Sequence, residues 1–267
     1  MLPLERDLLK RKRHLPNFAA NISWLFTELD FLDRFEAASA AGFKGVECLF
    51  PYDYKASDYA ARLTKHDLQA VLINAPPGDW DGGERGLAAQ KGRESDFRDS
   101  LMEAIDYAHE IGCPHIHIMA GLQAGSDRQC YIDNLKWSGE ALGHARMLGL
   151  IEPINTFDMP GYFLESPDQA AEILNEISSP HLGLQLDLYH VARMGLDPAT
   201  MIDNHKNLIG HFQIAGVPQR HEPNTGDVNF EPLFQKIDSM PNDAWVGCEY
   251  KPRQTTNDGL AWLGPYL

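Results

Sequence analysis

Eight times along this chain, a short apolar run typical of a β-strand is followed by a longer stretch typical of a helix. The predicted strands cover residues 18–26, 45–50, 70–75, 115–120, 147–155, 182–189 and 209–215, and a last strand begins at residue 245. This alternation is the pattern of repeated βα units, whose strands lie parallel in one sheet. Eight units in 267 residues, about 33 residues each, favour a single closed (β/α)8 barrel over an open doubly wound sheet.

Two of the predicted helices have clear boundaries. One begins near Ser95, carries apolar residues along one face and stops at Gly112, because glycine is common just past a helix end. Another begins with Ser166 as its N-cap and Pro167 in its first turn. We also expect helices over residues 31–38, 132–146 and 258–263.

Apolar and polar side chains alternate along several predicted strands, and successive side chains on a strand point to opposite faces. In strand 182–189, Leu184 and Leu186 share one face while Gln185 and Asp187 share the other. In the last strand one face is apolar and consists of Val246, Cys248 and Tyr250. The other face ends in two charged residues and consists of Gly247, Glu249 and Lys251. In a closed barrel the apolar faces would pack on the helices, so we expect the polar faces to converge inside.

Composition and charge narrow the class of partner. The formal net charge of −15 repels phosphate backbones, which argues against nucleic acid. No apolar run reaches the length of a membrane span, and the four cysteines show no CxxC pairing. We therefore expect a cytoplasmic protein with reduced thiols that acts on a small molecule, and homo-oligomerisation is left open. Residues 1–16 are expected to form a charged N-terminal extension, and residues 17–267 one barrel domain.

Polar residues stand at the carboxyl ends of the predicted strands, where the active sites of such barrels lie. They are Glu47, Asn74, Glu152, Asp187, Gln213 and Glu249. Gathering several carboxylates in one cavity costs several kcal/mol per charge unless something neutralises them, and Lys251 alone would be too little. Carboxylate and amide oxygens are ligands that suit Mg²⁺ or Mn²⁺, whereas zinc would recruit histidine or cysteine.

We therefore predict a divalent metal site. Its expected ligands are the four polar residues at the ends of the last strands, which are separated by 35, 26 and 36 residues: Glu152, Asp187, Gln213 and Glu249. The alternative for each acid alone is that it caps the next helix. His190 lies just past a strand end, where it is either a donor to a bound oxygen or an ordinary loop histidine.

The residues at these strand ends also carry a family resemblance. The matching stretches are FAANISWLF at 18–26, ECLFPYDY at 47–54, PGDW at 77–80, GERG at 83–86, GRE at 92–94, IEPIN at 151–155, DLYH at 187–190, QIA at 213–215 and GCEYKPR at 247–253. From about residue 17 to the C-terminus the chain resembles the hydroxypyruvate isomerase family, within the xylose-isomerase-like barrel superfamily.

The resemblance implies both an activity and roles for individual residues. Glu152 and Glu249 would be the catalytic pair of a metal-dependent isomerase that interconverts hydroxypyruvate and tartronate semialdehyde (2-hydroxy-3-oxopropanoate) through an enediolate. Lys251 or Arg253 would hold the substrate carboxylate, with Arg220 as a further candidate. The remaining expected substrate contacts are His190, Glu47 and Asn74. The glycine-rich stretch 79–93 is a candidate lid.

Other activities remain open at this point. A similar group isomerises 2-oxo-tetronates, and the short stretch 121–130 leaves the size of the substrate undecided. Keto-sugar 3-epimerases resemble this chain too, but they tend to carry histidine where Gln213 stands, and a neutral sugar needs no inward Lys251. Apurinic endonucleases share the barrel but need a histidine-rich zinc cluster and a basic DNA track. A barrel that binds a ligand without catalysis is the last alternative.

Overall fold

The computed structural model describes residues 16–242 and 244–266. Its centre is a closed barrel of eight parallel strands that pair in sequence order, with β8 returning to β1. The strands are β1 (Asn17–Asn21), β2 (Gly45–Cys48), β3 (Gln69–Asn74), β4 (His115–His117), β5 (Leu148–Ile151), β6 (Leu182–Asp187), β7 (Ile209–Ile214) and β8 (Trp245–Cys248). The predicted (β/α)8 barrel is confirmed. The expected N-terminal extension lies outside the described residues, apart from Pro16.

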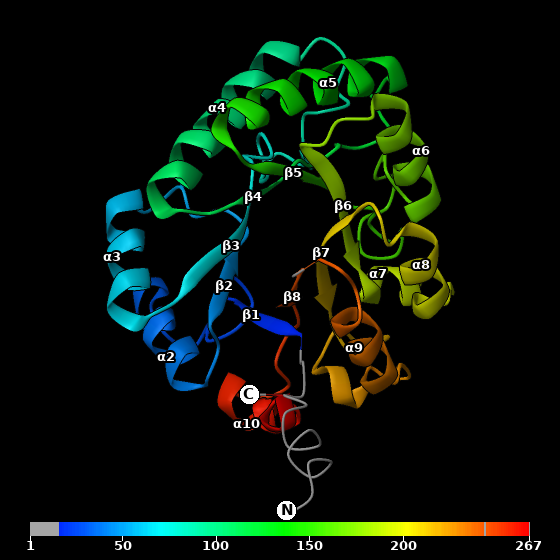
Figure 1. The fold of residues 1–267 in the computed structure, drawn as a ribbon. Helices are drawn as coiled ribbons and strands as arrows, with labels where there is room; N and C mark the ends of the chain where they lie inside the picture. Colours follow the sequence, from blue (N-terminus) through cyan, green and yellow to red (C-terminus); the bar gives the residue numbers. More distant parts are fainter. Residues whose placement is uncertain (1–15, 243, 267) are drawn as a thin grey trace, which may run out of the picture.

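Helices form a ring outside the strands (Figure 1). The α-helices are α2 (Arg34–Ala40), α3 (Ala56–His66), α4 (Glu94–Ile111), α5 (Arg128–Ala145), α6 (Pro167–Ile177), α7 (Leu188–Arg193), α8 (Pro198–His205), α9 (Glu231–Asp238) and α10 (Thr256–Gly259). The 3-10 helices are η1 (Phe31–Asp33), η2 (Pro223–Thr225), η3 (Leu260–Trp262) and η4 (Gly264–Tyr266). None of the helices in the described part of the chain is both long enough and apolar enough to cross a membrane.

Local sequence signals explain where several elements begin and end. Gly112 ends α4 in a left-handed conformation (φ 68°), and the Ser166 hydroxyl accepts the Gln169 N–H at the start of α6, as predicted. All seven predicted strands with a stated end run past the observed end, by one to five residues. Local hydrogen bonds explain two of these ends. β1 ends at Asn21 because its side-chain oxygen accepts the Ser23 N–H and turns the chain. β6 ends at Asp187 because its carboxylate accepts the Tyr189 N–H and caps α7.

Three predicted helices also differ from the structure. The helix expected over 31–38 is the 3-10 helix η1 followed by α2, which ends at Ala40. The helix expected over 132–146 begins earlier, because the Asp127 carboxylate accepts the Cys130 N–H and caps α5. The helix expected over 258–263 is instead the short α10 followed by η3.

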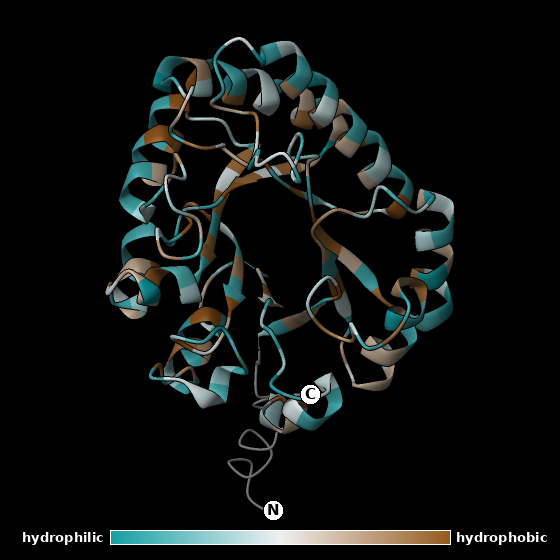
Figure 2. Ribbon diagram, turned by 180° about the vertical axis from the view of Figure 1, so that it is seen from behind, coloured by the Kyte–Doolittle hydropathy of each residue, from teal (hydrophilic) through white to brown (hydrophobic). Residues whose placement is uncertain are grey.

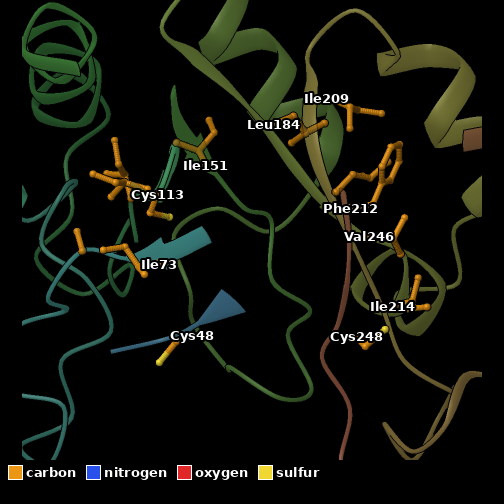
Figure 3. Packing of buried hydrophobic residues seen from close by; sticks show 14 of the residues in the cluster. Cys48, Ile73, Cys113, Ile151, Leu184, Ile209, Phe212, Ile214, Val246 and Cys248 are labelled. Carbon is orange, nitrogen blue, oxygen red and sulfur yellow. The ribbon is translucent and has the colours of Figure 1, made fainter. Parts of the chain in front are cut away.

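The faces of the strands divide as predicted. Leu184, Phe212 and Val246, labelled in Figure 3, are fully buried in the cluster that joins the strands to the surrounding helices. In the ribbon coloured by hydropathy, brown concentrates on the strands and teal on the outer helices (Figure 2). A separate small cluster that includes Ala19 and Leu150 is packed against Trp245, the first residue of β8. The apolar part of the interior is therefore near the amino ends of the strands, which leaves the carboxyl ends to polar residues.

A glycine on β8 makes room for one of these polar residues. A Cβ atom placed on Gly247 would collide with the carboxylate of Glu47. Glu47 is only 1% exposed, and its carboxylate contacts His211 and Gln213 of β7. Glycine at this position therefore allows the Glu47 side chain to lie across the barrel interior.

Candidate active site

A cavity of about 520 Å³ opens among the loops that follow the strands. Its polar lining comes from residues at or just after the carboxyl ends of the strands, together with the aromatic residues that surround them. The lining includes Trp24, Asn74, Trp80, His117, Glu152, Asp158, Gln185, Tyr189, His190, Arg220, Glu249 and Lys251. This is where a barrel of this kind places its chemistry.

The three acids predicted from the strand ends are brought together. Glu152 directly follows β5, Asp187 ends β6 and Glu249 directly follows β8. Their exposed fractions are 5%, 1% and 8% respectively. They are therefore buried carboxyl groups at one end of the barrel, as the alternation of side chains predicts.

Two side-chain amides orient Glu249. Its Oε2 accepts hydrogen bonds from Asn21 Nδ2 (2.9 Å) and Gln213 Nε2 (2.7 Å). The same amides donate to Oε1 of Glu47, and the Nε2 atom of His211 lies 2.7 Å from the other oxygen of Glu47. Glu47 was predicted to contact the substrate, but it is not among the described residues that line the cavity. It lies in the polar layer beside Glu249.

The other predicted substrate contacts fall in different places. Asn74 ends β3 and lines the cavity, and so do His190 and the exposed Lys251. Arg253 lies elsewhere: its Nε is 3.5 Å from the carboxylate of Glu222, and both residues line a separate surface pocket. Lys251 is therefore better placed than Arg253 to meet a ligand in this cavity.

The cation closest to the acids is Arg220, which the sequence indicated only as a further candidate. Its Nη2 lies 2.6 Å from Glu249 Oε1 and 3.7 Å from Asp187 Oδ2. Its guanidinium also lies against the rings of Trp24 (4.7 Å) and Tyr189 (4.9 Å). Arg220 belongs to the loop after β7, far in sequence from the acids, and no strand periodicity marks it.

Burial raises the pKa of all three acids. The pKa of Glu152 is raised well above its ordinary value by burial, with the charges of Glu249 and Asp187 adding to the effect. Burial raises the pKa of Asp187 to about 6 and that of Glu249 to about 8, although the nearby Arg220 lowers both. One guanidinium is therefore too little to compensate three buried carboxylates.

Two histidines beside the acids are neutral. Burial lowers the pKa of His117 to about 3 and that of His190 well below its ordinary value. Their ring nitrogens lie 3.6 Å and 3.8 Å from the carboxylate oxygens of Glu152. These histidines therefore add no positive charge to the site near neutral pH.

The residues present fit a divalent cation. Glu152, Asp187 and His190 can offer ligand atoms that all lie within 4.8 Å of one another. Asp187 Oδ2 is buried and finds no hydrogen-bond partner among the described residues. The predicted ligand Gln213 lies beside Glu249, and its Oε1 accepts a hydrogen bond from Gln185 Nε2 (2.6 Å). A buried carboxylate oxygen that accepts no hydrogen bond, although His190 Nε2 (3.5 Å) and Arg220 Nη2 (3.7 Å) lie near it, suits a cation-binding site.

The glycine-rich stretch 79–93, a candidate lid, is held at both ends. Glu84 is ion-paired with Arg93, and the Glu84 carboxylate accepts the Asp79 N–H. The second half packs on the chain after β4, where Ala89 N–H donates to Ala120 O. Trp80 lies in the first half and lines the cavity while 37% exposed. The lid remains a prediction, and Trp80 is the residue through which it would reach a ligand.

Comparison with known proteins places the chain among isomerases. The xylose isomerase-like TIM barrel family matches residues 35–266. A 2-oxo-tetronate isomerase from Cupriavidus necator is 48% identical over 95% of this chain and 99% of its own length. Hydroxypyruvate isomerase from Escherichia coli is 42% identical over 93% of this chain and 98% of its own length.

A solved structure shares the fold over nearly the whole chain, although its description names a different activity. A crystal structure from Brucella melitensis, described as an AP endonuclease of family 2, superposes with a TM-score of 0.92 at 44% identity and covers 94% of this chain and 99% of that one. Identities of 42% and 48% over nearly the whole length are far above what a shared barrel alone gives. The chain is thus an isomerase and belongs to the hydroxypyruvate isomerase family of the xylose isomerase-like TIM barrels.

Proposed function

We propose that this protein is a divalent-metal-dependent isomerase of small 2-keto-3-hydroxy acids that interconverts hydroxypyruvate and tartronate semialdehyde. The observation that carries the proposal is the gathering of Glu152, Asp187 and Glu249, all with raised pKa values, around Arg220 at one end of the barrel, where Glu152, Glu249 and Arg220 line the cavity. Relatives that are 42% and 48% identical carry the names of isomerases of such acids, which supports the choice of reaction.

Mg²⁺ or Mn²⁺ is the proposed cofactor, and its proposed ligands are Glu152, Asp187, Gln213 and Glu249. Bound there, the cation would supply the positive charge that stabilises an enediolate. The unpartnered Oδ2 of Asp187 supports this assignment, and so does the shortage of protein cations near the acids.

Glu152 and Glu249 are the proposed catalytic residues. In the reaction one proton moves from C3 to C2 of hydroxypyruvate, and a second moves from the C3 oxygen to the C2 oxygen. We assign the carbon proton to Oε1 of Glu249, because Arg220 orients this oxygen from the cavity side while two amides hold Oε2. A positioned base of this kind contributes about 10²- to 10⁴-fold to the rate.

The substrate carboxylate needs a cation that faces the cavity. Lys251 lines the cavity and is exposed, so its ammonium is free to approach a bound acid. Arg220 also lines the cavity, and its backbone carbonyl accepts the Lys251 N–H (2.7 Å), so the two residues start from neighbouring points of the backbone. We propose that Lys251 captures the carboxylate and that Arg220 orients it together with Glu249.

A 2-oxo-tetronate is the second candidate substrate, because the C. necator relative with 48% identity carries that name. The cavity of about 520 Å³ admits acids of either three or four carbons. Steady-state assays of the Mg²⁺- and Mn²⁺-loaded protein on hydroxypyruvate and on 2-oxo-tetronates would decide between them by kcat/KM. The higher value with hydroxypyruvate is expected, and no turnover of either acid would refute the proposed function.

Chelation tests the dependence on metal. We expect EDTA followed by gel filtration to abolish turnover, and Mg²⁺ or Mn²⁺ to restore it, because the proposed ligands are oxygen atoms. Full activity of protein shown by elemental analysis to be metal-free would refute the metal assignment but not the choice of substrate.

A further inference from the structure

The backbone sets the orientation of the Asn155 side chain, which follows β5 and is 1% exposed. Its Oδ1 accepts the N–H groups of Phe157 (3.0 Å) and Asp158 (2.9 Å). A reversed amide would place the Nδ2 hydrogens against these two donors, so only one orientation satisfies the site. Nδ2 must therefore point away from the turn.

On that side lies the ring of His190. Asn155 Nδ2 is 2.6 Å from His190 Nδ1, and it also donates to Asp158 Oδ2 (3.2 Å). The backbone N–H of Asn155 faces the same ring nitrogen at 3.5 Å. Because the groups facing Nδ1 are donors, Nδ1 accepts, and the neutral imidazole carries its proton on Nε2.

The Nε2 atom of His190 faces the acids. It lies 3.5 Å from Asp187 Oδ2 and 3.8 Å from Glu152 Oε1. A protonated nitrogen has no lone pair for a cation, although His190 is close enough to serve as a ligand by distance alone. The two roles of His190, metal ligand or hydrogen-bond donor, therefore depend on which nitrogen holds the proton.

We propose that Asn155 is a positioning residue that fixes the His190 proton on Nε2, so that His190 donates a hydrogen bond into the cavity and the metal ligands are oxygen atoms only. The role rests on the proposed function, because His190 lines the cavity and its hydrogen bond would go to an oxygen of a substrate bound there. It also explains why a histidine beside two acids need not convert the site into a zinc site.

The first test measures the tautomer directly and needs no activity. The ring nitrogens of ¹⁵N-histidine-labelled protein would be recorded by NMR, without metal and with Mg²⁺, and His190→Gln would identify the signals of this ring. We expect an unprotonated Nδ1 and a protonated Nε2 in both states. A proton on Nδ1, or loss of the Nε2 proton when Mg²⁺ binds, would overturn the proposal even if the isomerase activity is as proposed.

The second test reverses the hydrogen bond. Asn155→Asp keeps an oxygen for the two backbone N–H groups but presents a carboxylate to His190 Nδ1, which draws the proton to Nδ1. We expect kcat to fall about 10- to 100-fold, as for other residues that orient a group in an active site, with little change in KM. The NMR signals should show that the proton has moved. An unchanged kcat would overturn the proposal.

Two further variants separate positioning from a structural effect. Asn175→Asp makes the same chemical change on the exposed side of α6 and should leave kcat as in the wild type. In a His190→Gln background, whose amide donates without a tautomer, Asn155→Asp should cause little further loss. A full additional loss there would show that Asn155 only supports the fold. If Asn155→Asp does not fold, the NMR spectrum of the wild-type protein still shows which nitrogen of His190 carries the proton, and so tests the proposal.

Discussion

Arg220 Nη2 lies 2.6 Å from Glu249 Oε1 and 3.7 Å from Asp187 Oδ2, so one guanidinium faces acids from two different strands. Its charge lowers the pKa of Glu249, which burial would otherwise raise further. The aromatic rings of Trp24 and Tyr189 limit where the guanidinium can move. Arg220 therefore controls the ionisation of the proposed base as well as its orientation.

Replacing Arg220 with methionine should lower kcat/KM about 10- to 150-fold, because one charge-assisted hydrogen bond contributes about 1.5 to 3 kcal/mol. Removal of the cation disfavours the ionised carboxylate, so the pKa of Glu249 should rise. The acidic limb of the pH profile of kcat/KM should therefore move to higher pH. Arg220→Lys should shift that limb less, since it retains the charge. If the acidic limb does not move in Arg220→Met, Arg220 does not control the ionisation of the base.

Lys251→Met should mainly weaken capture of the substrate. Methionine keeps the length of the stem and removes the ammonium, so kcat/KM should fall about 10- to 150-fold, with most of the change in KM. Lys136→Met, on the exposed side of α5, is a matched control that should change neither constant. A larger loss in Arg253→Met than in Lys251→Met would assign the carboxylate to the pocket beside Glu222 instead.

The two glutamates can be separated by following the carbon-bound hydrogen. Glu249→Gln should lose both turnover and exchange of the substrate C–H with deuterated water, because it removes the base that we assign to this proton. Glu152→Gln should lose turnover, by about 10²- to 10⁴-fold, and keep part of the exchange. Proton NMR of the substrate measures both. If both variants, with metal bound, keep more than about a tenth of the wild-type rate, neither glutamate is the base.

The thermal stability of the metal-free protein should fall as the pH rises from 5 to 8. The folded-state pKa of Glu249 (about 8) and of Asp187 (about 6) lie above their ordinary values of 4.5 and 3.8. The folded state therefore holds more protons than the unfolded state in this range, and the stability gained from them is lost as the pH rises. Calorimetry should show a smaller fall for Glu249→Gln.

Mg²⁺ provides the complementary measurement. It should raise the Tm more at pH 8 than at pH 5, since its ligands must be deprotonated. Equal shifts at both pH values would contradict this account of the acids.

The sequence predicted the fold and the acids for the same reason. Side chains of strands alternate strictly, so Asp187 and Glu249 can be assigned to the inner face and to the carboxyl end from the sequence alone. Arg220 could not be assigned this way, because it lies in a loop. Asn155 was expected as the last residue of strand 147–155, but β5 ends at Ile151, so Asn155 lies in the loop that follows. The contacts of such residues depend on turns. In one of these turns the side-chain oxygen of Asn155 accepts the backbone N–H groups of Phe157 and Asp158.

Strand ends were predicted less well than strand faces. The hydrophobic pattern of the sequence extends past Asn21 and Asp187. The strands stop at these residues because each side chain accepts a hydrogen bond from the backbone N–H two residues later. Such local hydrogen bonds compete with the sheet without altering the apolar pattern from which the strand was predicted.

The contact between Gly247 and Glu47 also constrains how the family can vary. Any side chain at position 247 would occupy the space of the Glu47 carboxylate, and Glu47 in turn receives donors from Asn21, Gln213 and His211. A substitution at 247 therefore requires the Glu47 carboxylate to move away from these donors or a shorter residue to replace Glu47, and either change leaves three buried polar groups in need of new partners. Positions 47 and 247, which lie 200 residues apart, should consequently evolve as a pair.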